Sequence, residues 1–262
     1  MKTVVITGGT RGIGLAMALE FLSRCCRVTV SGRGDNLPEP VARVLQAYQD
    51  SIQYVRCNVQ NKEDVDALWD RAAERWGRVD IWINNAGQNA PYEYVYDTDC
   101  KSADAVIDTN IRGMIYGSQV AAARMREQGS GQIWNMEGLG SNGMIQAKTV
   151  LYGMSKSALT YFTKGLAKEL NGTGVLAGRL SPGMMLTDFI TKAPDGEASP
   201  VLKDESFKKV FNTLADKPET VAAFLVPRML ANTRNDAHIM WLTNSKAAWR
   251  FMTSPMRKRE LI

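Results

Sequence analysis

A tyrosine and a lysine, Tyr152 and Lys156, stand four residues apart in the helical pattern VLYGMSKSALTYFTKGLAKEL. This spacing places both side chains on one face of a helix. A lysine ammonium beside a phenol stabilises the phenolate and so lowers the tyrosine pKa. Such a tyrosine can give a proton to a carbonyl oxygen as hydride reaches the carbon, which is general acid catalysis. Taken alone the pair is weak evidence, because chance Tyr/Lys pairs are common on solvated helices.

A glycine-rich segment, NMEGLGSNG at 135–143, precedes the pair and follows the apolar run QIWNM. Glycine is entropically costly at a strand end, so a ligand or another part of the chain is expected to approach the backbone closely there. Its glycines leave space beside Tyr152. Glu137 in this segment is either a solvent-facing loop acid or a group that orients the substrate or a proton relay, and the sequence leaves both interpretations open.

A second glycine-rich turn follows the first apolar run, TVVIT, and leads into a helical pattern. Its spacing is G-x-x-x-G-x-G, and glycines at such a junction let the backbone approach a pyrophosphate at the helix N-terminus. A plain tight turn is the alternative, but the place between first strand and first helix favours a dinucleotide site. The residues predicted to bind the cofactor here are Gly8, Thr10, Arg11, Gly12, Ile13 and Gly14.

The end of the second apolar run indicates which dinucleotide is bound. A carboxylate there would hold the ribose 2′-hydroxyl, whereas an arginine would meet a 2′-phosphate. This run ends Ser31-Gly32-Arg33 with no acid before Asp35, and Arg11 stands in the glycine turn. Two guanidinium groups favour NADPH as the cofactor. The alternative is that Arg33 is an ordinary surface residue.

Short apolar runs alternate with helical patterns along the whole chain, which is typical of a parallel sheet covered by helices on both faces. We therefore expect an α/β fold: one doubly wound Rossmann-type domain over 1–262 with a seven-stranded parallel sheet. The expected strands are 3–7, 27–31, 52–57, 79–84, 131–136, 174–181 and 238–243. The expected helices are 12–24, 39–50, 61–76, 101–126, 150–171, 206–215 and 218–230. Residues 184–230 are predicted to form substrate-binding loops and helices, and 244–262 a C-terminal tail.

The composition narrows the classes of partner. The 262 residues carry a formal net charge of +5, and the basic residues are dispersed apart from Arg257–Arg259 near the end. No nucleic-acid partner is expected from this pattern. The single histidine, His238, argues against Ser-His-Asp catalysis and against multi-histidine metal sites, so no metal is predicted.

No apolar run reaches the length of about 18 residues that a membrane span needs, and the chain opens directly in a strand-like run. The cysteines lack C-x-x-C spacing, which favours a reducing compartment, and we expect a cytoplasmic protein. The tail pairs Trp241, Trp249, Met252 and Met256 with its basic run. Peripheral membrane contact, a subunit contact and ordinary packing are all open for this face.

The glycine turn TGGTRGIG at 7–14 and the Tyr152/Lys156 pair resemble motifs of the short-chain dehydrogenases/reductases. The resemblance covers about residues 1–190. The resemblance implies that Tyr152 is the acid/base, that Lys156 also binds the nicotinamide ribose, and that Asn110 in DTNIRG holds a water of the proton relay. It departs at Asn58, where the family usually has aspartate beside the adenine. The further positions to which it assigns cofactor binding are Asn58, Val59, Asn85, Ala86, Gly87, Pro182, Gly183 and Thr187, with Tyr152 and Lys156.

The catalytic serine of that family normally lies thirteen residues before the tyrosine, and Leu139 occupies that position here. Ser141 is the nearest serine and the candidate for its role. The segment NMEGLGS is similar to NMDGAGS in the chlorophyll b reductases, the non-yellow-colouring group. That likeness continues in VLYGMSK and SPGMMLTD and, in the C-terminal part, in PETVAAFLVPRM and IMWLTNSKAAW.

The resemblance implies reduction of the C7 formyl of chlorophyll(ide) b to a hydroxymethyl group with NADPH, and therefore a small-molecule partner that is a large planar pigment. Two alternatives stay open: a short-chain reductase of another bulky aldehyde or ketone, and a dinucleotide-binding regulator without turnover. The displaced serine favours the regulator, whereas the presence of Asn110, Tyr152 and Lys156 together argues against it. The family also implies a homodimer or homotetramer.

Overall fold

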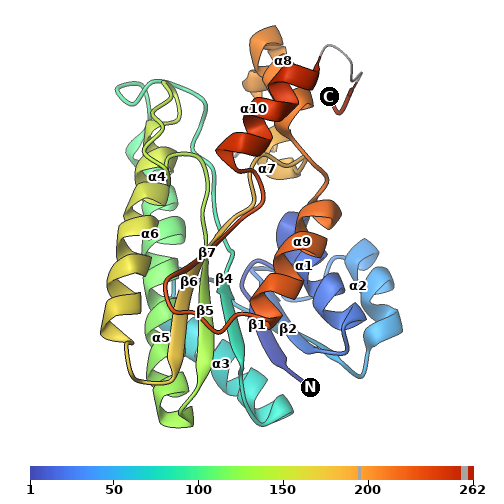
Figure 1. The fold of residues 1–262 in the computed structure, drawn as a ribbon, viewed down its shortest axis with the longest axis vertical. Coiled ribbons are helices and arrows are strands. Elements are labelled where there is room, and N and C mark those ends of the chain that lie inside the picture. The colour runs from blue at the N-terminus through green and yellow to red at the C-terminus, as the bar shows by residue number, and fades with distance from the viewer. Residues whose placement is uncertain (194–195, 255–258) are drawn as a thin grey trace.

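The computed structural model describes residues 1–193, 196–254 and 259–262. Its centre is a seven-stranded sheet in which every neighbouring pair of strands is parallel, in the order β3-β2-β1-β4-β5-β6-β7 (Figure 1). The strands are β1 Thr3–Ile6, β2 Arg27–Gly32, β3 Ile52–Arg56, β4 Ile81–Asn84, β5 Gly131–Met136, β6 Val175–Ser181 and β7 Ala237–Met240. The predicted doubly wound sheet is confirmed.

Helices cover both faces of the sheet (Figure 1). They are α1 Gly12–Ser23, α2 Glu39–Leu45, α3 Lys62–Trp76, α4 Cys100–Val106, α5 Gly113–Gln128, α6 Val150–Glu169, α7 Asp188–Thr191, α8 Glu205–Leu214, α9 Pro218–Leu230 and α10 Asn244–Thr253. Two short 3-10 turns are η1 Gln46–Tyr48 and η3 Pro200–Lys203, and η2 Ile107–Arg112 is a π-helix. The helices α1 and α9 pack together on one face, and α3, α5 and α6 lie on the other.

The strands are continuous apolar runs because both of their faces are buried. One core lies between the sheet and α1 and α9, around side chains such as Phe21 and Leu225. The other lies between the sheet and α3, α5 and α6, where Trp69 and Trp82 stack with ring centroids 5.9 Å apart. Both layers bring helix N-termini to the carboxyl edge of the sheet, where the glycine turn and the glycine-rich segment 135–143 also lie.

The expected single helix over 101–126 is three elements, because the π-helix η2 separates α4 from α5. At the start of α5, a Cβ on Gly113 would lie 2.7 Å from a methyl group of Val59, so the helix approaches that loop as only glycine permits. The wider π turn carries Asn110 inward, where it is 1% exposed. Single π turns inside α-helices often mark functional sites.

The strand order reverses between β1 and β4, and ligands of open α/β sheets bind outside the carboxyl ends of the strands at such a reversal. The helices α7, α8 and α10 lie above this edge in Figure 1. The polar stretch 184–205, predicted as a loop or short helices, contains α7 and η3. In the described part of the chain, no helix combines the length and the apolar character that crossing a bilayer requires.

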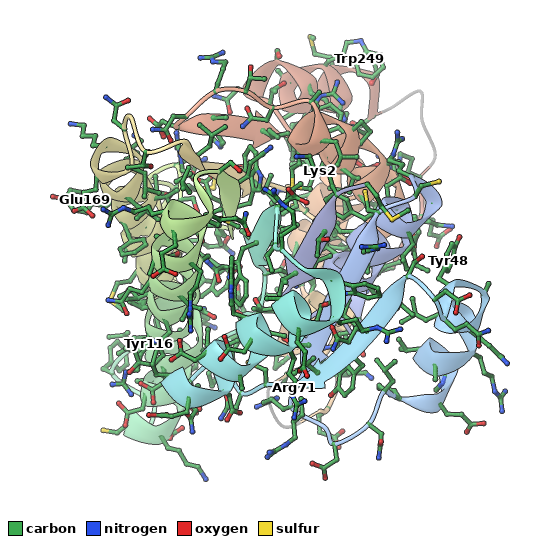
Figure 2. The ribbon with its side chains drawn as sticks, turned by 90° about the horizontal axis from the view of Figure 1, so that it is seen from below. Lys2, Tyr48, Arg71, Tyr116, Glu169 and Trp249 are labelled. Atoms are coloured by element: carbon green, nitrogen blue, oxygen red, sulfur yellow. The ribbon has the colours of Figure 1, made fainter. Side chains whose placement is uncertain are left out.

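The tail contains an unpredicted helix, α10, whose Arg250 donates to Asp216 at 2.7 Å. Trp241 does not belong to an exposed apolar face, since its indole N–H also donates to Asp216 and its ring packs on Phe224. The exposed aromatic residues of α10 are Trp249 and Phe251, and Trp249 lies at the periphery in Figure 2. Of the predicted basic and apolar face, Met256, Arg257 and Lys258 lie outside the described residues, while Arg259 bonds to Asp216.

Candidate active site

The glycine turn between β1 and α1 is packed closely on the loop after β4. A Cβ on Gly14 would lie 2.5 Å from Nδ2 of Asn85, which donates to the carbonyl oxygens of Thr7 and Gly8 at 2.9 and 3.0 Å. The N-cap of α1 is Arg11, which provides no side-chain hydrogen bond to the first turn. The first-turn amides of α1 thus have no side-chain cap, which suits the pyrophosphate of a dinucleotide.

Every residue predicted to bind the cofactor lines one cavity of about 2360 Å³. These residues are Gly8, Thr10, Arg11, Gly12, Ile13, Gly14, Arg33, Asn58, Val59, Asn85, Ala86, Gly87, Tyr152, Lys156, Pro182, Gly183 and Thr187. Ligand sites are commonly 300–1,000 Å³, so this cavity has room for a dinucleotide and a second ligand. Thr187 also closes over the turn, since its Cγ2 would be 3.4 Å from a Cβ on Gly12.

The two predicted guanidinium groups, Arg11 and Arg33, are exposed at the cavity wall. Within the described residues neither forms an ion pair. Asp35, the first acid after β2, is engaged by Arg56 at 3.2 Å. The two guanidinium groups without ion pairs, and the carboxylate of Asp35 that is already paired, together suit the binding of a phosphate at the end of β2.

Tyr152 and Lys156 lie on the buried side of α6, where Lys156 is 4% exposed. The Lys156 Nζ donates to the carbonyl oxygen of Met136 at 2.9 Å and lies 5.7 Å from the centre of the Tyr152 ring. Burial lowers the pKa of Lys156 to about 8, although the negative charge of Glu137 opposes that shift. Burial raises the pKa of Tyr152, where the sequence predicted a lowered one. The phenol is therefore protonated at neutral pH, as a proton donor must be.

Asn110 joins three segments of the site. Its amide nitrogen donates to the carbonyl oxygen of Gln88 at 2.9 Å and to the Ser155 hydroxyl at 3.0 Å, and its Oδ1 accepts from the Gln88 N–H at 2.7 Å. Ser155 in turn donates to the Tyr152 carbonyl oxygen at 2.7 Å. The side chain thus locks the loop after β4 against α6 below Tyr152. Its assignment to a water of the proton relay stays a prediction.

The residue beside the Tyr152 hydroxyl is Gly138. A Cβ on Gly138 would overlap that hydroxyl oxygen and lie 3.0 Å from Cζ of Tyr152. The thirteen-residue spacing pointed instead to Leu139, which lines the cavity one position further along the loop. No side chain of residue 138 can therefore polarise a carbonyl, because the position next to the phenol has none.

Ser141 also lines the cavity, but its hydroxyl serves the loop. Its Oγ accepts from the Gly138 N–H at 3.1 Å and donates to the Lys156 carbonyl oxygen at 3.3 Å. Ser141 thereby fixes Gly138 against α6. A direct contact between Ser141 and a substrate oxygen stays a prediction.

Glu137 is not a solvent-facing loop acid, because it is 4% exposed. It lies with Thr160, Arg179, Ser181 and His238, which we call the Glu137 cluster and which the sequence did not predict. One signal could have found it: Glu137, Ser181 and His238 lie in or just after β5, β6 and β7 near the same edge of the sheet. His238 uses the same nitrogen, Nε2, toward Ser181 and Glu137, so the three do not form a Ser-His-acid relay.

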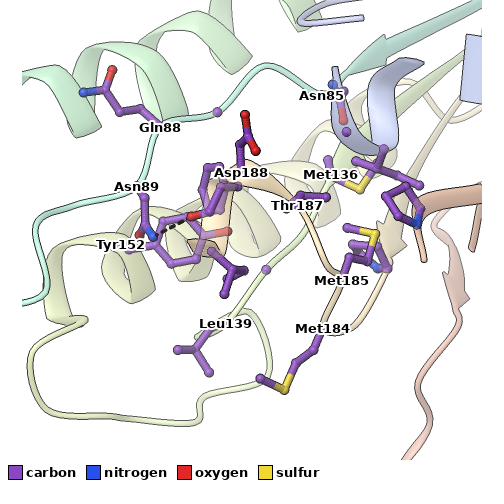
Figure 3. Close-up of a pocket in the computed structure, with 18 of the residues that line it drawn as sticks. Asn85, Gln88, Asn89, Met136, Leu139, Tyr152, Met184, Met185, Thr187 and Asp188 are labelled. Carbon is purple, nitrogen blue, oxygen red and sulfur yellow. Dashed lines mark hydrogen bonds between the residues drawn. The ribbon is translucent and has the colours of Figure 1, made fainter. Parts of the chain in front are cut away.

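Apolar side chains form the wall of the cavity around Tyr152. The Phe189 ring lies 5.5 Å from the Tyr152 ring, and the Phe189 carbonyl oxygen accepts from Asn89 at 3.2 Å. Figure 3 shows Leu139, Met184 and Met185 around the opening beside Tyr152. Flexible methionine side chains adapt well to a broad apolar ligand.

A family model described as short chain dehydrogenase matches residues 2–198. The chain belongs to this family. It is 32% identical to a probable chlorophyll(ide) b reductase, NYC1, chloroplastic, of Oryza sativa subsp. japonica, over 98% of this chain and 53% of that protein. It is 33% identical to the chlorophyll(ide) b reductase NOL, chloroplastic, of the same plant, over 93% of this chain and 72% of that protein. Among solved structures, ElxO with NADP bound has a TM-score of 0.80 at 25% identity, covering 94% of this chain and 99% of that one.

This short-chain dehydrogenase spans about half the length of NYC1. Its geometry brings together a dinucleotide cradle, a buried Tyr/Lys pair and a wide apolar cavity, which suits oxidoreduction between a nicotinamide and a carbonyl or alcohol. Three or more His, Cys, Asp or Glu side chains are nowhere grouped to hold a metal ion within the ranges that the structure describes.

Proposed function

We propose that this chain is an NADPH-dependent carbonyl reductase whose substrate is the C7 formyl group of chlorophyll(ide) b. One observation carries the proposal. The family model ends at residue 198, but the similarity to the rice reductase spans 98% of the chain. It therefore includes 184–230, the segment predicted to contact the substrate. The apolar cavity wall around Tyr152 supports a large flat molecule there.

NADPH is supported as the hydride donor by residues of this chain. Arg11 and Arg33 line the cavity where the adenosine ribose of a Rossmann-type cofactor would lie, and Asp35, the first acid after β2, is paired with Arg56. The ElxO structure, at 25% identity, contains NADP. Bound NADPH would supply the hydride to the carbonyl carbon.

The chain's own groups complete the reaction. The Tyr152 hydroxyl gives its proton to the carbonyl oxygen, and the Lys156 ammonium stabilises the phenolate that remains. Met136 holds Lys156 in place through its carbonyl oxygen, and Asn110 braces the turn of α6 that carries Tyr152. Because residue 138 has no side chain, the loop can lie directly against the phenol without displacing it.

The direct test is to incubate pure protein with NADPH and chlorophyllide b and to follow the pigment spectrum. We expect conversion to the 7-hydroxymethyl product with equimolar loss of NADPH. If the protein binds NADPH but leaves chlorophyllide b unchanged, the pigment assignment is wrong.

A second candidate function is reduction of another bulky aldehyde or ketone by the same residues. The apolar wall of Leu139, Met184, Met185 and Phe189 favours it, because these side chains select for size and apolar character rather than for a pigment. A panel of aromatic, steroid-like and acyl-chain carbonyls, followed by NADPH absorbance, distinguishes the two candidates. Oligomeric state and cellular compartment stay predictions.

Arg33→Gln is expected to raise the KM for NADPH about tenfold or more and to leave the KM for NADH within about twofold, since a charge-assisted bond to a phosphate is worth about 1.5–3 kcal/mol. Steady-state kinetics with both cofactors measures the change. Arg43→Gln is a matched control, because Arg43 is an exposed arginine whose partner is Glu39 on its own helix. An equal loss with both cofactors would contradict the phosphate contact of Arg33.

A further inference from the structure

The carboxylate of Glu137 is buried and held by residues of three elements. Thr160 on α6 donates to its Oε1 at 2.9 Å, and Arg179 on β6 lies 3.6 Å from the same oxygen. Ser181 on β6 donates to Oε2, and His238 on β7 lies 2.8 Å from it. A buried charge with this many partners is restrained in position, because any movement would leave it buried without those partners.

The two chain neighbours of Glu137 both touch the Tyr/Lys pair. Met136 accepts the hydrogen bond of the Lys156 ammonium at 2.9 Å, and Gly138 lies against the Tyr152 hydroxyl. The backbone N–H of Glu137 donates to the Leu180 carbonyl oxygen at 2.8 Å, which extends the pairing of β5 with β6 by one residue. The side chain that fixes residue 137 therefore also fixes the two backbone contacts on either side of it.

Glu137 also supplies the negative charge near Lys156. The titratable or charged groups on the elements packed around α6 are Glu137 after β5, Arg179 on β6, His238 on β7, Asp108 and Arg112 on η2, and Lys101 and Asp104 on α4. Asp108 and Arg112 pair with each other at 2.9 Å, and the two groups on α4 are exposed. Burial lowers the pKa of Lys156 and Glu137 raises it, so the glutamate opposes loss of the ammonium proton.

We propose that Glu137 is a positioning residue for proton transfer at Tyr152. Its carboxylate, tied to α6, β6 and β7, holds Met136 against Lys156 and Gly138 against Tyr152, and keeps the Lys156 ammonium charged in a buried site. The proposal rests on the proposed carbonyl reduction for its kinetic readout. It does not depend on which carbonyl is the natural substrate, so any carbonyl compound that the protein reduces can serve in the test.

Glu137→Gln removes the charge and keeps the size of the side chain. Because the reaction needs charged Lys156, activity is lost as pH rises through the pKa of that lysine. We expect the high-pH limb of the kcat profile to move down by about one pH unit and kcat at pH 7.5 to fall about threefold. The Kd for NADPH is expected to change less than threefold. Glu137→Asp restores the charge and is expected to bring the limb back to within about 0.3 units of the wild-type position.

Thr160→Val is the matched control, because it removes a hydrogen bond to Glu137 and keeps the carboxylate. Its high-pH limb is expected to stay in place. If Glu137→Gln leaves the limb in place, or Thr160→Val moves it equally, the charge of Glu137 does not act on Lys156 and the proposal fails. Circular dichroism and Tm of each variant establish that the comparison is made on folded protein.

A second measurement requires no turnover. Protein labelled with [6-13C]lysine reports the titration of Lys156 by NMR, with the signal assigned from the spectrum of Lys156→Arg. We expect the Lys156 titration in Glu137→Gln to lie about one unit below that of the wild type. An unchanged titration overturns the proposal, whether or not the protein reduces carbonyls. A shifted titration in a protein that reduces no carbonyl would instead refute the proposed function and leave the charge coupling in place.

Discussion

Tyr152→Phe is expected to lower kcat for carbonyl reduction by about 10³-fold, within the range that a positioned general acid contributes. The change removes one oxygen atom and keeps the ring, which packs on Phe189 with centroids 5.5 Å apart. The fold and the cofactor cradle are therefore expected to persist, with the Kd for NADPH changed less than threefold. Single-turnover absorbance at 340 nm measures the hydride step, and quenching of protein fluorescence measures binding.

Tyr161→Phe is the matched control, since Tyr161 lies on the same helix, α6, and is 84% exposed. It is expected to retain full activity. Loss of turnover in Tyr152→Phe with retained NADPH binding distinguishes an enzyme from a dinucleotide-binding regulator, which has no use for the phenol. Unchanged turnover in Tyr152→Phe would show that another group, or water, provides the proton.

The sheet could be predicted from the sequence because its strands are apolar on both faces, and such runs separated by helices allow few other folds. The Tyr/Lys pair and the glycine turn could also be predicted from the sequence, since both depend on local spacing. The side chains that surround the Tyr/Lys pair could not be predicted in this way, because they depend on which strands become neighbours in the sheet. His238 lies about 100 positions from Glu137 in the chain, and no local pattern connects them.

Local spacing was an incomplete guide at two places. Over 101–126 the periodicity indicated one helix, but the fit of Gly113 on Val59 and the burial of Asn110 accompany a π turn there. Counting thirteen residues back from Tyr152 leads to Leu139, whereas the residue beside the phenol is Gly138, and the role of Ser141 stays a prediction. Spacing along a chain stops predicting proximity where a loop changes length.

Gly138→Ala is the second prediction with a large expected effect. An added Cβ would overlap the Tyr152 hydroxyl and lie 3.2 Å from Cγ of Lys156, so one of the two side chains must move. Displacing a reacting group by about 1 Å costs on the order of 10²-fold in rate, and we expect a loss of kcat of about that size. Unfolding by urea is expected to show a destabilisation of about 1–3 kcal/mol, as overpacking typically produces.

Gly153→Ala is its control, because a Cβ there would make only ordinary contacts, the nearest at 3.8 Å to Cα of Gly140. This variant is expected to keep at least about half of the wild-type kcat and at least about half of the wild-type free energy of unfolding, since alanine also favours the helix. If Gly138→Ala were as active as Gly153→Ala, the loop would have room beside Tyr152 and the reason for a glycine at 138 would lie elsewhere.

The clash at Gly138 can be separated from a general loosening of the loop by combining the two large changes. In Tyr152→Phe the hydroxyl oxygen is absent, and the remaining neighbours of an added Cβ are the ring carbon at 3.0 Å and Lys156 Cγ at 3.2 Å. Adding Gly138→Ala to Tyr152→Phe should therefore destabilise the protein less than adding it to the wild type, by about 0.5–3 kcal/mol of coupling. Additive free energies of unfolding would mean that residue 138 and the phenol are not in contact, and the reason for a glycine beside Tyr152 would lie elsewhere.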